Sequence, residues 1–581
     1  MMSTLKNPRK SCDLCYQRKI KCDRAKPRCS HCITYVTDCT YAAPSRKSRP
    51  KKRQNCAKTD ATTGHTQDRL RNLEDLVEQL SETVKVNHQD NGAQHQTQVQ
   101  QQEGIPIDTA SQTFSASTDG GFTVQGQKHN VSMALPPLEH VLPIAKIFLK
   151  SFNAALPLFY DDTLLCLIHN FYNAPYPQRD PVAWAAINIV LALAHRNNLV
   201  STSSSNTNLS IEYLNKAESV LSSIVLGDTQ LLNIQVLVGM VLLLQASPDL
   251  TPSLILIATT MRLAHKIGLH DRTASAHMGA VDARQRACVF WMAYILDKDL
   301  SMRLKQPSIQ LDDDVNLELP SLEVFPYQVN NRCINDTSVS VSSGIIVTTD
   351  GTVEMNYFVT RIQLAVIEGG VYDYLYSTRS QKRNIEERSH ALETIACALE
   401  TWKASIPFEF SAFMAPDTVS PIVLQLLAVL HSTSLACTTL LNQANAWNTY
   451  WMEGIRKYAV ESILPTLPPQ WEALVDEARQ LTALLGALPH QNRWNFWMTG
   501  CTHMTAILLL TFNSMQRPQH DLLSLDNELV DKGLQMLDRV EEETQSEIVR
   551  SFRKTCTGLH RDAQQRRAEA SVMANSLNLP T

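Results

Sequence analysis

Six cysteines between residues 12 and 39 constrain this chain more than any other feature. They form two successive runs with the same spacing: Cys12-x2-Cys15-x6-Cys22 and Cys29-x2-Cys32-x6-Cys39. A C-x2-C pair lets two thiolates reach one tetrahedral zinc ion, a frequent arrangement in structural sites. The sequence therefore predicts that metal binding folds this segment, which is too short to bury a sufficient core of its own.

The number of thiolates limits how the metal can be held. Two separate four-cysteine sites would need more thiolates than the six present, whereas two zinc ions fit if two thiolates bridge them. The symmetry of the repeat makes the first cysteine of each half, Cys12 and Cys29, the expected bridging pair. The alternative is a single four-cysteine zinc site with two bystander cysteines. We expect two Zn²⁺ per chain.

The residues around these cysteines also resemble a known family. The string from Cys12 to Asp23 and the string Lys26-Pro27-Arg28-Cys29 are similar to the six-cysteine fungal binuclear zinc-cluster transcription factors. In that family the first and fourth cysteines bridge the two metals. The resemblance implies a DNA-binding module and a transcription regulator that acts in the nucleus.

Charge is distributed unevenly along the chain. Residues 1–53 carry 15 Lys and Arg against 3 Asp, whereas the other residues carry 38 basic and 54 acidic side chains. A basic N-terminal segment followed by an acidic remainder indicates that a polyanion binds the N-terminal segment alone. Double-stranded DNA is the partner that the family resemblance implies.

The resemblance maps DNA contacts onto five basic residues. Arg18 and Lys19 lie where the family places a short helix in the major groove, and both are donors suited to the O6 and N7 acceptors of guanine. Base contact by this pair agrees with the family's preference for CGG-like half-sites. Lys21, Lys26 and Arg28 are expected to contact phosphates, which position the module without specifying sequence. For any single lysine, the alternative is a solvated counter-charge to the thiolates.

A second basic run follows the last cysteine. It is broken by prolines and is read as a nuclear-localisation signal or a phosphate-tracking arm, with a solvated charge run as the alternative. Its members are Arg46, Lys47, Arg49, Lys51, Lys52 and Arg53.

Residues 69–87 carry a short heptad repeat. Leucine at the d positions and β-branched residues at two of the a positions favour a parallel two-stranded coiled coil. One small zinc module contacts too few base pairs for useful specificity. A homodimer would read two half-sites and so recognise a longer DNA sequence. The alternative is one amphipathic helix docked on the body. The repeat consists of Leu70, Leu73, Val77, Leu80 and Val84.

The rest of the chain is expected to be mainly all-α. Long apolar-periodic segments with few β-branched alternations predict helices over residues 142–153, 182–195, 230–246, 254–267 and 284–300. The expected domains are a zinc cluster (8–44), a basic linker (45–68), a coiled coil (69–87), a disordered Gln/Ser/Thr-rich spacer (88–134), a middle homology helical domain (135–400), a helical C-terminal region (401–555) and a polar tail (556–581).

The middle region also resembles the same family. The strings 258–270 and 286–301 are similar to its middle homology region, although Lys305-Gln306 departs from the usual Gly-Arg. Gly268 is expected to cap a helix, and Trp291, Tyr294 and Leu300 are expected in the core. Residues 328–356 are read as a long loop or insertion.

The scattered cysteines occur in apolar, helix-like surroundings. They are expected to be inert core residues rather than ligands or nucleophiles, and they are Cys166, Cys288, Cys397, Cys437 and Cys501.

No sequence pattern indicates catalysis. The chain lacks a Gly-rich phosphate loop, a G-x-S-x-G elbow and an H-E-x-x-H motif, and no apolar run reaches membrane-spanning length. We expect a non-enzymatic, zinc-dependent regulator of genes transcribed by RNA polymerase II that contacts the transcription machinery. By analogy it activates a metabolic or secondary-metabolite gene cluster; the alternatives are a repressor, or a regulator of primary nutrient or xenobiotic metabolism.

Overall fold

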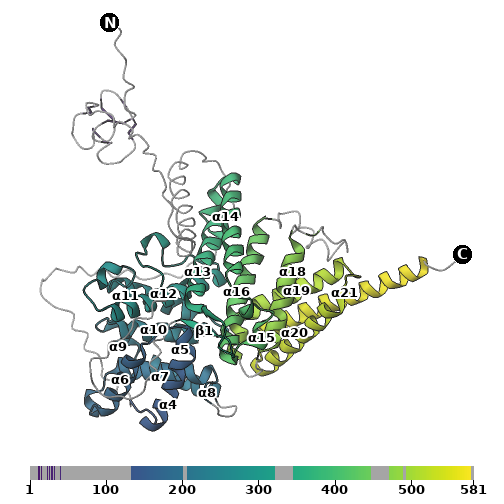
Figure 1. Ribbon diagram of the computed structural model, residues 1–581. Helices are drawn as coiled ribbons and strands as arrows, with labels where there is room; N and C mark the ends of the chain where they lie inside the picture. The colour runs from purple at the N-terminus through teal and green to yellow at the C-terminus, as the bar shows by residue number, and fades with distance from the viewer. Residues whose placement is uncertain are drawn as a thin grey trace, which may run out of the picture. The chain divides into compact units, whose positions relative to one another are not determined.

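The computed structural model describes residues 133–200, 206–320, 344–445, 470–488 and 493–577, together with Leu467 and eleven positions between residues 11 and 40 that include the six clustered cysteines. Its contacts divide the chain into two units, residues 1–66 and residues 67–581. The described part of the second unit is almost entirely helical (Figure 1), which confirms the expected fold class.

The first group of helices lies within residues 138–404. They are α4 (Leu138–Lys150), α5 (Phe152–Ala155), α6 (Asp161–Asn173), α7 (Pro181–Arg196), α8 (Asn206–Glu218), α9 (Leu221–Leu226), α10 (Leu231–Leu244), α11 (Thr251–Lys266), α12 (Ala280–Leu304), α13 (Tyr357–Val371) and α14 (Ile385–Ala404). Short 3₁₀ or π turns lie between some of them, at Tyr176–Gln178, Arg272–Ser275, Asp312–Asp314, Tyr372–Tyr376 and Ser380–Lys382.

The second group completes the unit. After a 3₁₀ turn at Phe408–Phe410 come α15 (Ala415–Thr418), α16 (Pro421–Asn445), α18 (Trp471–Gly486), α19 (Arg493–Gln516), α20 (Leu523–Thr544) and α21 (Glu547–Leu577). Helices α13 and α16 pack on each other, and they connect the α4–α12 helices, blue to teal in Figure 1, to the α18–α21 helices, green to yellow.

The centre of the first group is formed by α7 and α10. Both helices are apolar on nearly every face, and most of their residues are buried. Gly239 of α10 lets the two approach closely, because a Cβ there would lie 2.3 Å from Cγ2 of Ile189. The absence of amphipathic periodicity in these segments is thus explained by burial on all sides.

Side-chain caps fix where several helices begin. The Asp180 carboxylate accepts hydrogen bonds from the backbone nitrogens of Val182 and Ala183 at 3.1 Å each, and Pro181 occupies the first helical position of α7. At the start of α14, Asn384 and Glu387 form a reciprocal capping box. These local signals lie in the sequence itself.

Helix α11 ends as its sequence predicts. Gly268 follows the last helical turn with φ of +70°, and the nitrogen of Leu269 donates to the carbonyl of Ala264 at 2.9 Å. A left-handed residue at this position closes the exposed carbonyls of the final turn. The predicted burial of Trp291, Tyr294 and Leu300 in α12 is also confirmed.

The expected loop over residues 328–356 is wrong in its last part. Residues 344–356 form an antiparallel hairpin of β1 (Ile345–Val347) and β2 (Glu354–Asn356), with Ile346 opposite Met355. The β-branched residues of β1 and the Asp350-Gly351 turn, with Gly351 at φ of +73°, favour this pairing. Residues 328–343 lie outside the described ranges.

The expectation that the scattered cysteines are core residues is correct for Cys288 and Cys437 and wrong for three others. Cys166, Cys397 and Cys501 are exposed. They lie at outward positions of α6, α14 and α19, whereas nearby residues on the same helices, such as Leu164, Ile395 and Met504, are buried.

Helix α16 is the one described helix long and apolar enough to cross a membrane by length and composition. The window over Pro421–Gln443 has a mean hydropathy of 1.5, and 67% of it is buried inside the helical unit, as expected for a core helix.

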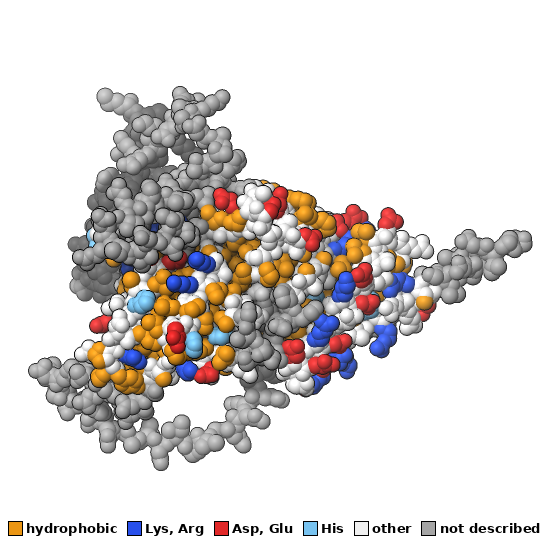
Figure 2. Space-filling view, turned by 60° about the horizontal axis from the view of Figure 1, so that its bottom comes forward, with side chains coloured by type: hydrophobic (Ala, Val, Ile, Leu, Met, Phe, Trp, Pro, Cys, Tyr) orange, Lys and Arg blue, Asp and Glu red, His pale blue; other side chains and the backbone are white. Residues whose placement is uncertain are grey.

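The C-terminal helices differ from α16 in the charge of their surfaces. On the face shown in Figure 2, acidic and basic side chains are interspersed towards the right. Ion pairs such as Arg550–Glu541 (2.8 Å) join α20 and α21.

Candidate metal centre and nucleic-acid interface

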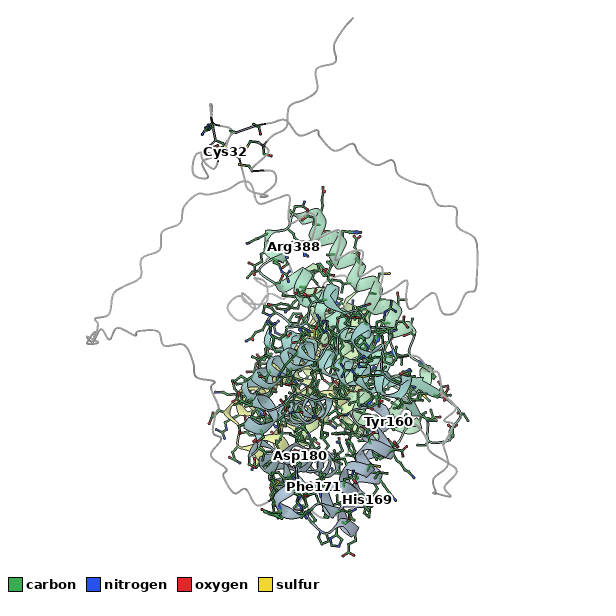
Figure 3. The ribbon with its side chains drawn as sticks, turned by 90° about the vertical axis from the view of Figure 1, so that its left-hand side faces the viewer. Cys32, Tyr160, His169, Phe171, Asp180 and Arg388 are labelled. Atoms are coloured by element: carbon green, nitrogen blue, oxygen red, sulfur yellow. The ribbon has the colours of Figure 1, made fainter. Side chains whose placement is uncertain are left out.

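The structure brings all six predicted zinc ligands together. Their sulfur atoms form two groups, each with all members within 4.8 Å of one another. The groups share the two residues that the sequence repeat marks as bridging, and Cys32 of this cluster is labelled in Figure 3. One group is Cys12, Cys15, Cys22 and Cys29; the other is Cys12, Cys29, Cys32 and Cys39.

The sulfur separations fit tetrahedral zinc. The Cys12 and Cys29 sulfurs are 3.7 Å apart, those of Cys12 and Cys32 are 3.6 Å apart, and those of Cys15 and Cys29 are 3.7 Å apart. A tetrahedron with Zn–S bonds of about 2.3 Å has edges of about 3.8 Å. A disulfide would bring two sulfurs to about 2.0 Å, so these are free thiols arranged as a ligand cage.

The environment of the cage makes it dependent on a cation. Burial raises the pKa of the Cys15 thiol, and burial also raises the pKa of the Cys32 thiol to about 12. Without a cation these sulfurs therefore stay protonated at neutral pH. A bound Zn²⁺ reverses this preference, since a coordinating thiol is deprotonated outright. The cluster binds two zinc ions, and the described residues of this segment form no core besides the cysteines themselves.

Of the five residues predicted to contact DNA, only Arg28 is among the residues that the structure describes. Arg28 is exposed and precedes the buried ligand Cys29, so its backbone position is fixed by the metal cage. Arg18, Lys19, Lys21 and Lys26 lie outside the described residues. So do the predicted nuclear-localisation residues 46–53 and the dimerisation residues 70–84.

A second cluster of charges, which sequence reasoning missed, lies in the helical unit. Arg361 of α13 pairs with Glu368 on the same helix and, at 3.4 Å, with Asp299 of α12. Glu368 is fully buried, and this burial raises the pKa of its carboxyl to about 8. The one signal in the sequence was two opposite charges seven residues apart in an otherwise apolar segment.

Lys298 of α12 is likewise buried and was missed. Its ammonium group donates to the Ser308 hydroxyl at 3.1 Å and to the carbonyl of Gln310 at 2.9 Å, and it pairs with Asp312 at 2.7 Å. The neighbouring carboxylate of Asp297 accepts from the nitrogens of Ile309 and Gln310. These contacts fasten the segment after α12 to the helix itself.

Comparison with known proteins places both regions in one family. Residues 10–48 match the fungal Zn(2)-Cys(6) binuclear cluster domain, and residues 145–404 match the fungal specific transcription factor domain. The chain belongs to the fungal zinc-cluster transcription factors. It is therefore a DNA-binding, zinc-dependent transcription regulator.

Individual relatives align over most of the chain. An ABC-transporter-regulating transcription factor of Aspergillus oryzae is 27% identical, over 96% of this chain and 73% of its own length. A protein of the same name from Aspergillus fumigatus is 26% identical, over 88% of this chain and 68% of its own. The fusaridione A cluster transcription factor of Fusarium heterosporum is 24% identical, over 74% of this chain and 78% of its own.

Proposed function

We propose that the two overlapping cysteine groups each hold one zinc ion, with Cys12 and Cys29 as shared ligands. The overlap of the groups at this pair and the separations of 3.6–3.7 Å support the assignment. A rigid two-metal cage of this kind fixes the chain on either side of each ligand. It thereby presents the adjoining basic residues to DNA in one conformation.

The basic residues beside the cage would then divide into two roles. Arg18 and Lys19 read bases of a CGG-like half-site, and Lys21, Lys26 and Arg28 contact phosphates. The exposure of Arg28 next to a buried ligand supports its share of this assignment. Two zinc ions and six thiolates sum to a charge of −2, so attraction to DNA has to come from these side chains.

The functional unit would be a nuclear homodimer. The heptad residues 70–84 join two chains, the basic run 46–53 directs them to the nucleus, and the intervening residues set the spacing of the half-sites. The domain boundaries proposed above follow the same division, from the zinc cluster (8–44) to the helical body (135–555) and the polar tail.

The target genes are proposed from the relatives. Two relatives that align over most of this chain are named as regulators of ABC transporters, so we propose that this protein activates the gene of an ABC transporter. A second candidate is a secondary-metabolite gene cluster, which the name of the Fusarium relative favours. The alternative is that the protein represses the same genes, and the experiment below distinguishes repression from activation.

That experiment combines genome-wide mapping of binding sites with transcript profiles of a deletion strain. Activation of a transporter gene predicts a binding site upstream of it and a fall in its transcript on deletion. A rise in the transcript would instead identify a repressor, and sites confined to a biosynthetic cluster would favour the second candidate. A chain with Arg18→Ala and Lys19→Ala should lose these sites, whereas Lys51→Ala should only weaken them.

A further inference from the structure

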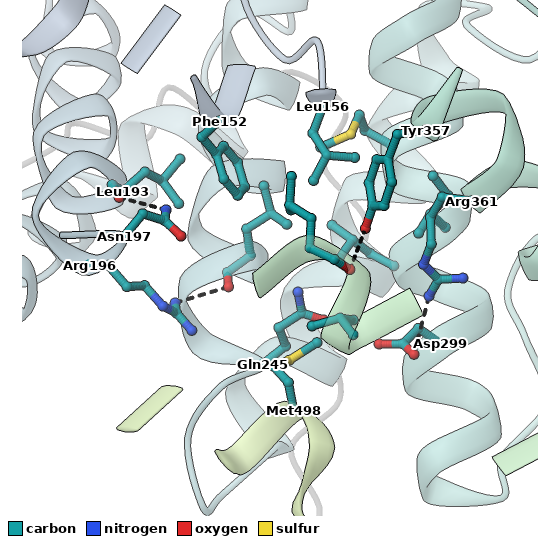
Figure 4. Close-up of a pocket in the computed structure, with 16 residues that line it drawn as sticks. Phe152, Leu156, Leu193, Arg196, Asn197, Gln245, Asp299, Tyr357, Arg361 and Met498 are labelled. Atoms are coloured by element: carbon teal, nitrogen blue, oxygen red, sulfur yellow. Dashed lines mark hydrogen bonds and ion pairs between the residues drawn. The ribbon is translucent and has the colours of Figure 1, made fainter. Parts of the chain in front are cut away.

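A cavity lies at the centre of the helical unit, away from the zinc cluster in the sequence. It is a partly open pocket whose empty space, counted together with the solvent at its mouth, is about 650 Å³. Its walls come from α5, α7, α10, α12, α13, α16 and α19, as Figure 4 shows for part of the lining.

The lining is mostly apolar. Of the 16 residues that line the cavity, eleven are aliphatic, aromatic or methionine side chains, among them Phe152, Leu296 and Met498. A preformed space with such walls favours an apolar occupant over bulk water. Polar groups are few and therefore determine which apolar molecule fits.

Two of these polar groups are acceptors without donors. Asn197 is 4% exposed and Gln245 is 6% exposed, and neither Asn197 Oδ1 nor Gln245 Oε1 has a hydrogen-bond partner among the described residues. The amide nitrogen of Asn197 is already used, because it donates to the carbonyl of Leu193 at 2.8 Å. Buried acceptors of this kind are rare in native proteins unless a ligand or water supplies the donor.

The charged groups at the cavity are matched within the protein. Asp299 and Arg361 lie 3.4 Å apart, and Arg361 also pairs with Glu368. The Arg196 guanidinium donates from one nitrogen to the carbonyls of Leu242 and Leu243 at 3.0 and 2.6 Å. Because these charged groups already bind one another or backbone carbonyls, the wall favours an uncharged ligand over an ionic one.

We propose that this cavity binds an uncharged, largely apolar small molecule whose hydroxyl or N–H group donates to Asn197 Oδ1 or to Gln245 Oε1. One donor satisfies one of these two acceptors, and a second donor on the same molecule would satisfy the other, while the apolar part of the ligand fills the remaining space between α5, α12 and α19. This binding is independent of DNA recognition and of the identity of the target genes.

The position of the cavity gives such a ligand a regulatory route. The wall joins helices within residues 145–404, which match the fungal specific transcription factor domain, to α16 and α19 beyond it. Arg303 of α12 crosses the same junction, donating to the carbonyl of Gln245 at 3.3 Å and to that of Trp497 at 2.9 Å. A ligand held by Gln245 thus contacts a residue that links the two groups of helices.

The test uses two probes that differ in one donor. Zinc-loaded full-length protein is titrated calorimetrically with 2-naphthol and with 2-methoxynaphthalene, which has the same ring system and no hydroxyl donor. We expect 2-naphthol to bind about tenfold more tightly, because only it can donate to one of the acceptors. Equal affinities, or no binding of either probe, would overturn the proposal.

Variants then locate the site. Asn197→Leu and Gln245→Met remove one acceptor each at similar volume. The variant that lacks the acceptor used by 2-naphthol, and the double variant, should bring the two dissociation constants to within about twofold of one another. Asn188→Leu is the matched control, since Asn188 Oδ1 is also buried and unpartnered but does not line the cavity. An equal effect of the control would refute the assignment. If a variant does not fold, the wild-type comparison of the two probes still decides.

Discussion

His503 of α19 is a buried histidine with neither ring nitrogen hydrogen-bonded among the described residues. Burial lowers the pKa of His503 to about 4, so the folded protein keeps the imidazole neutral. The unfolded chain binds a proton near pH 6.5, and between these two values it therefore holds more protons than the folded chain. Stability is consequently lost as pH falls from about 6.5 towards about 4.

His503→Phe should remove this part of the acid sensitivity. Between pH 7 and pH 5 the wild type should lose about 2 kcal/mol of unfolding free energy through this group, and the variant should not. Urea unfolding of the two proteins at both pH values measures the difference. His140→Phe, at an exposed position, is the control, and the same pH dependence in wild type and His503→Phe would contradict the account.

Lys298 offers a second prediction at the residue scale. Its ammonium group is buried beside Asp312 and two oxygens of residues 308–310. Its removal takes away the cation paired with Asp312, which keeps the Tyr294 hydroxyl as a donor, and one of the two donors to the carbonyl of Gln310. Lys298→Met should lower the unfolding free energy by about 3 kcal/mol. A double-mutant cycle with Asp312→Asn should show strong coupling between the two residues. A loss below about 0.5 kcal/mol would mean that the pair is not holding the segment.

At the scale of single elements, the end of α11 depends on one glycine. Gly268 has φ of +70°, and a Cβ there would lie 2.6 Å from the Cβ of Ala274. Both the backbone conformation and the close contact disfavour any side chain.

Gly268→Ala should therefore destabilise the protein by more than about 1 kcal/mol. Gly486→Ala is the matched control, because its Cβ would meet nothing within 4 Å and its backbone is helical. That substitution should be neutral or stabilise by up to about 1 kcal/mol. Thermal unfolding of both variants measures the contrast, and an equal response would show that the left-handed cap is unimportant.

Elements with local signals could be predicted from the sequence. Caps such as Asp180-Pro181 and Gly268, and the fixed spacing of the cysteines, specify structure through residues only a few positions apart. The exposed faces of Cys166 and Cys501 could not be predicted, since neighbouring apolar residues do not show which side of a helix packs inward. The hairpin at residues 345–356 was missed because its strands are very short.

The cavity could not be predicted for a different reason. Seven helices far apart in the sequence supply its walls, and Asn197 and Gln245 become notable only because packing leaves their oxygens without donors. A buried polar residue in an apolar helix is by itself an ordinary observation. The charge pair Arg361–Glu368 was the nearest sequence signal to this region.

At the scale of the whole molecule, the two units should respond differently to loss of metal. Among the described residues of the first unit, the cysteine ligands form the whole core, whereas the helical unit has an extensive core of its own. Chelation of zinc should abolish DNA binding and leave the far-ultraviolet helical signal nearly unchanged. Restored binding on zinc addition is the control. A large loss of helical signal would show that the metal also supports the helical unit.

The central claim is sequence-specific DNA binding by the two-zinc module. Its most direct test is the ratio of two dissociation constants for the zinc-loaded full-length chain at about 150 mM salt. One is for a duplex with paired CGG-like triplets recovered by selection, and the other is for a duplex of the same composition in scrambled order. The account predicts a ratio of about 10³ or more. Equal dissociation constants, with two zinc ions bound per chain, would contradict it.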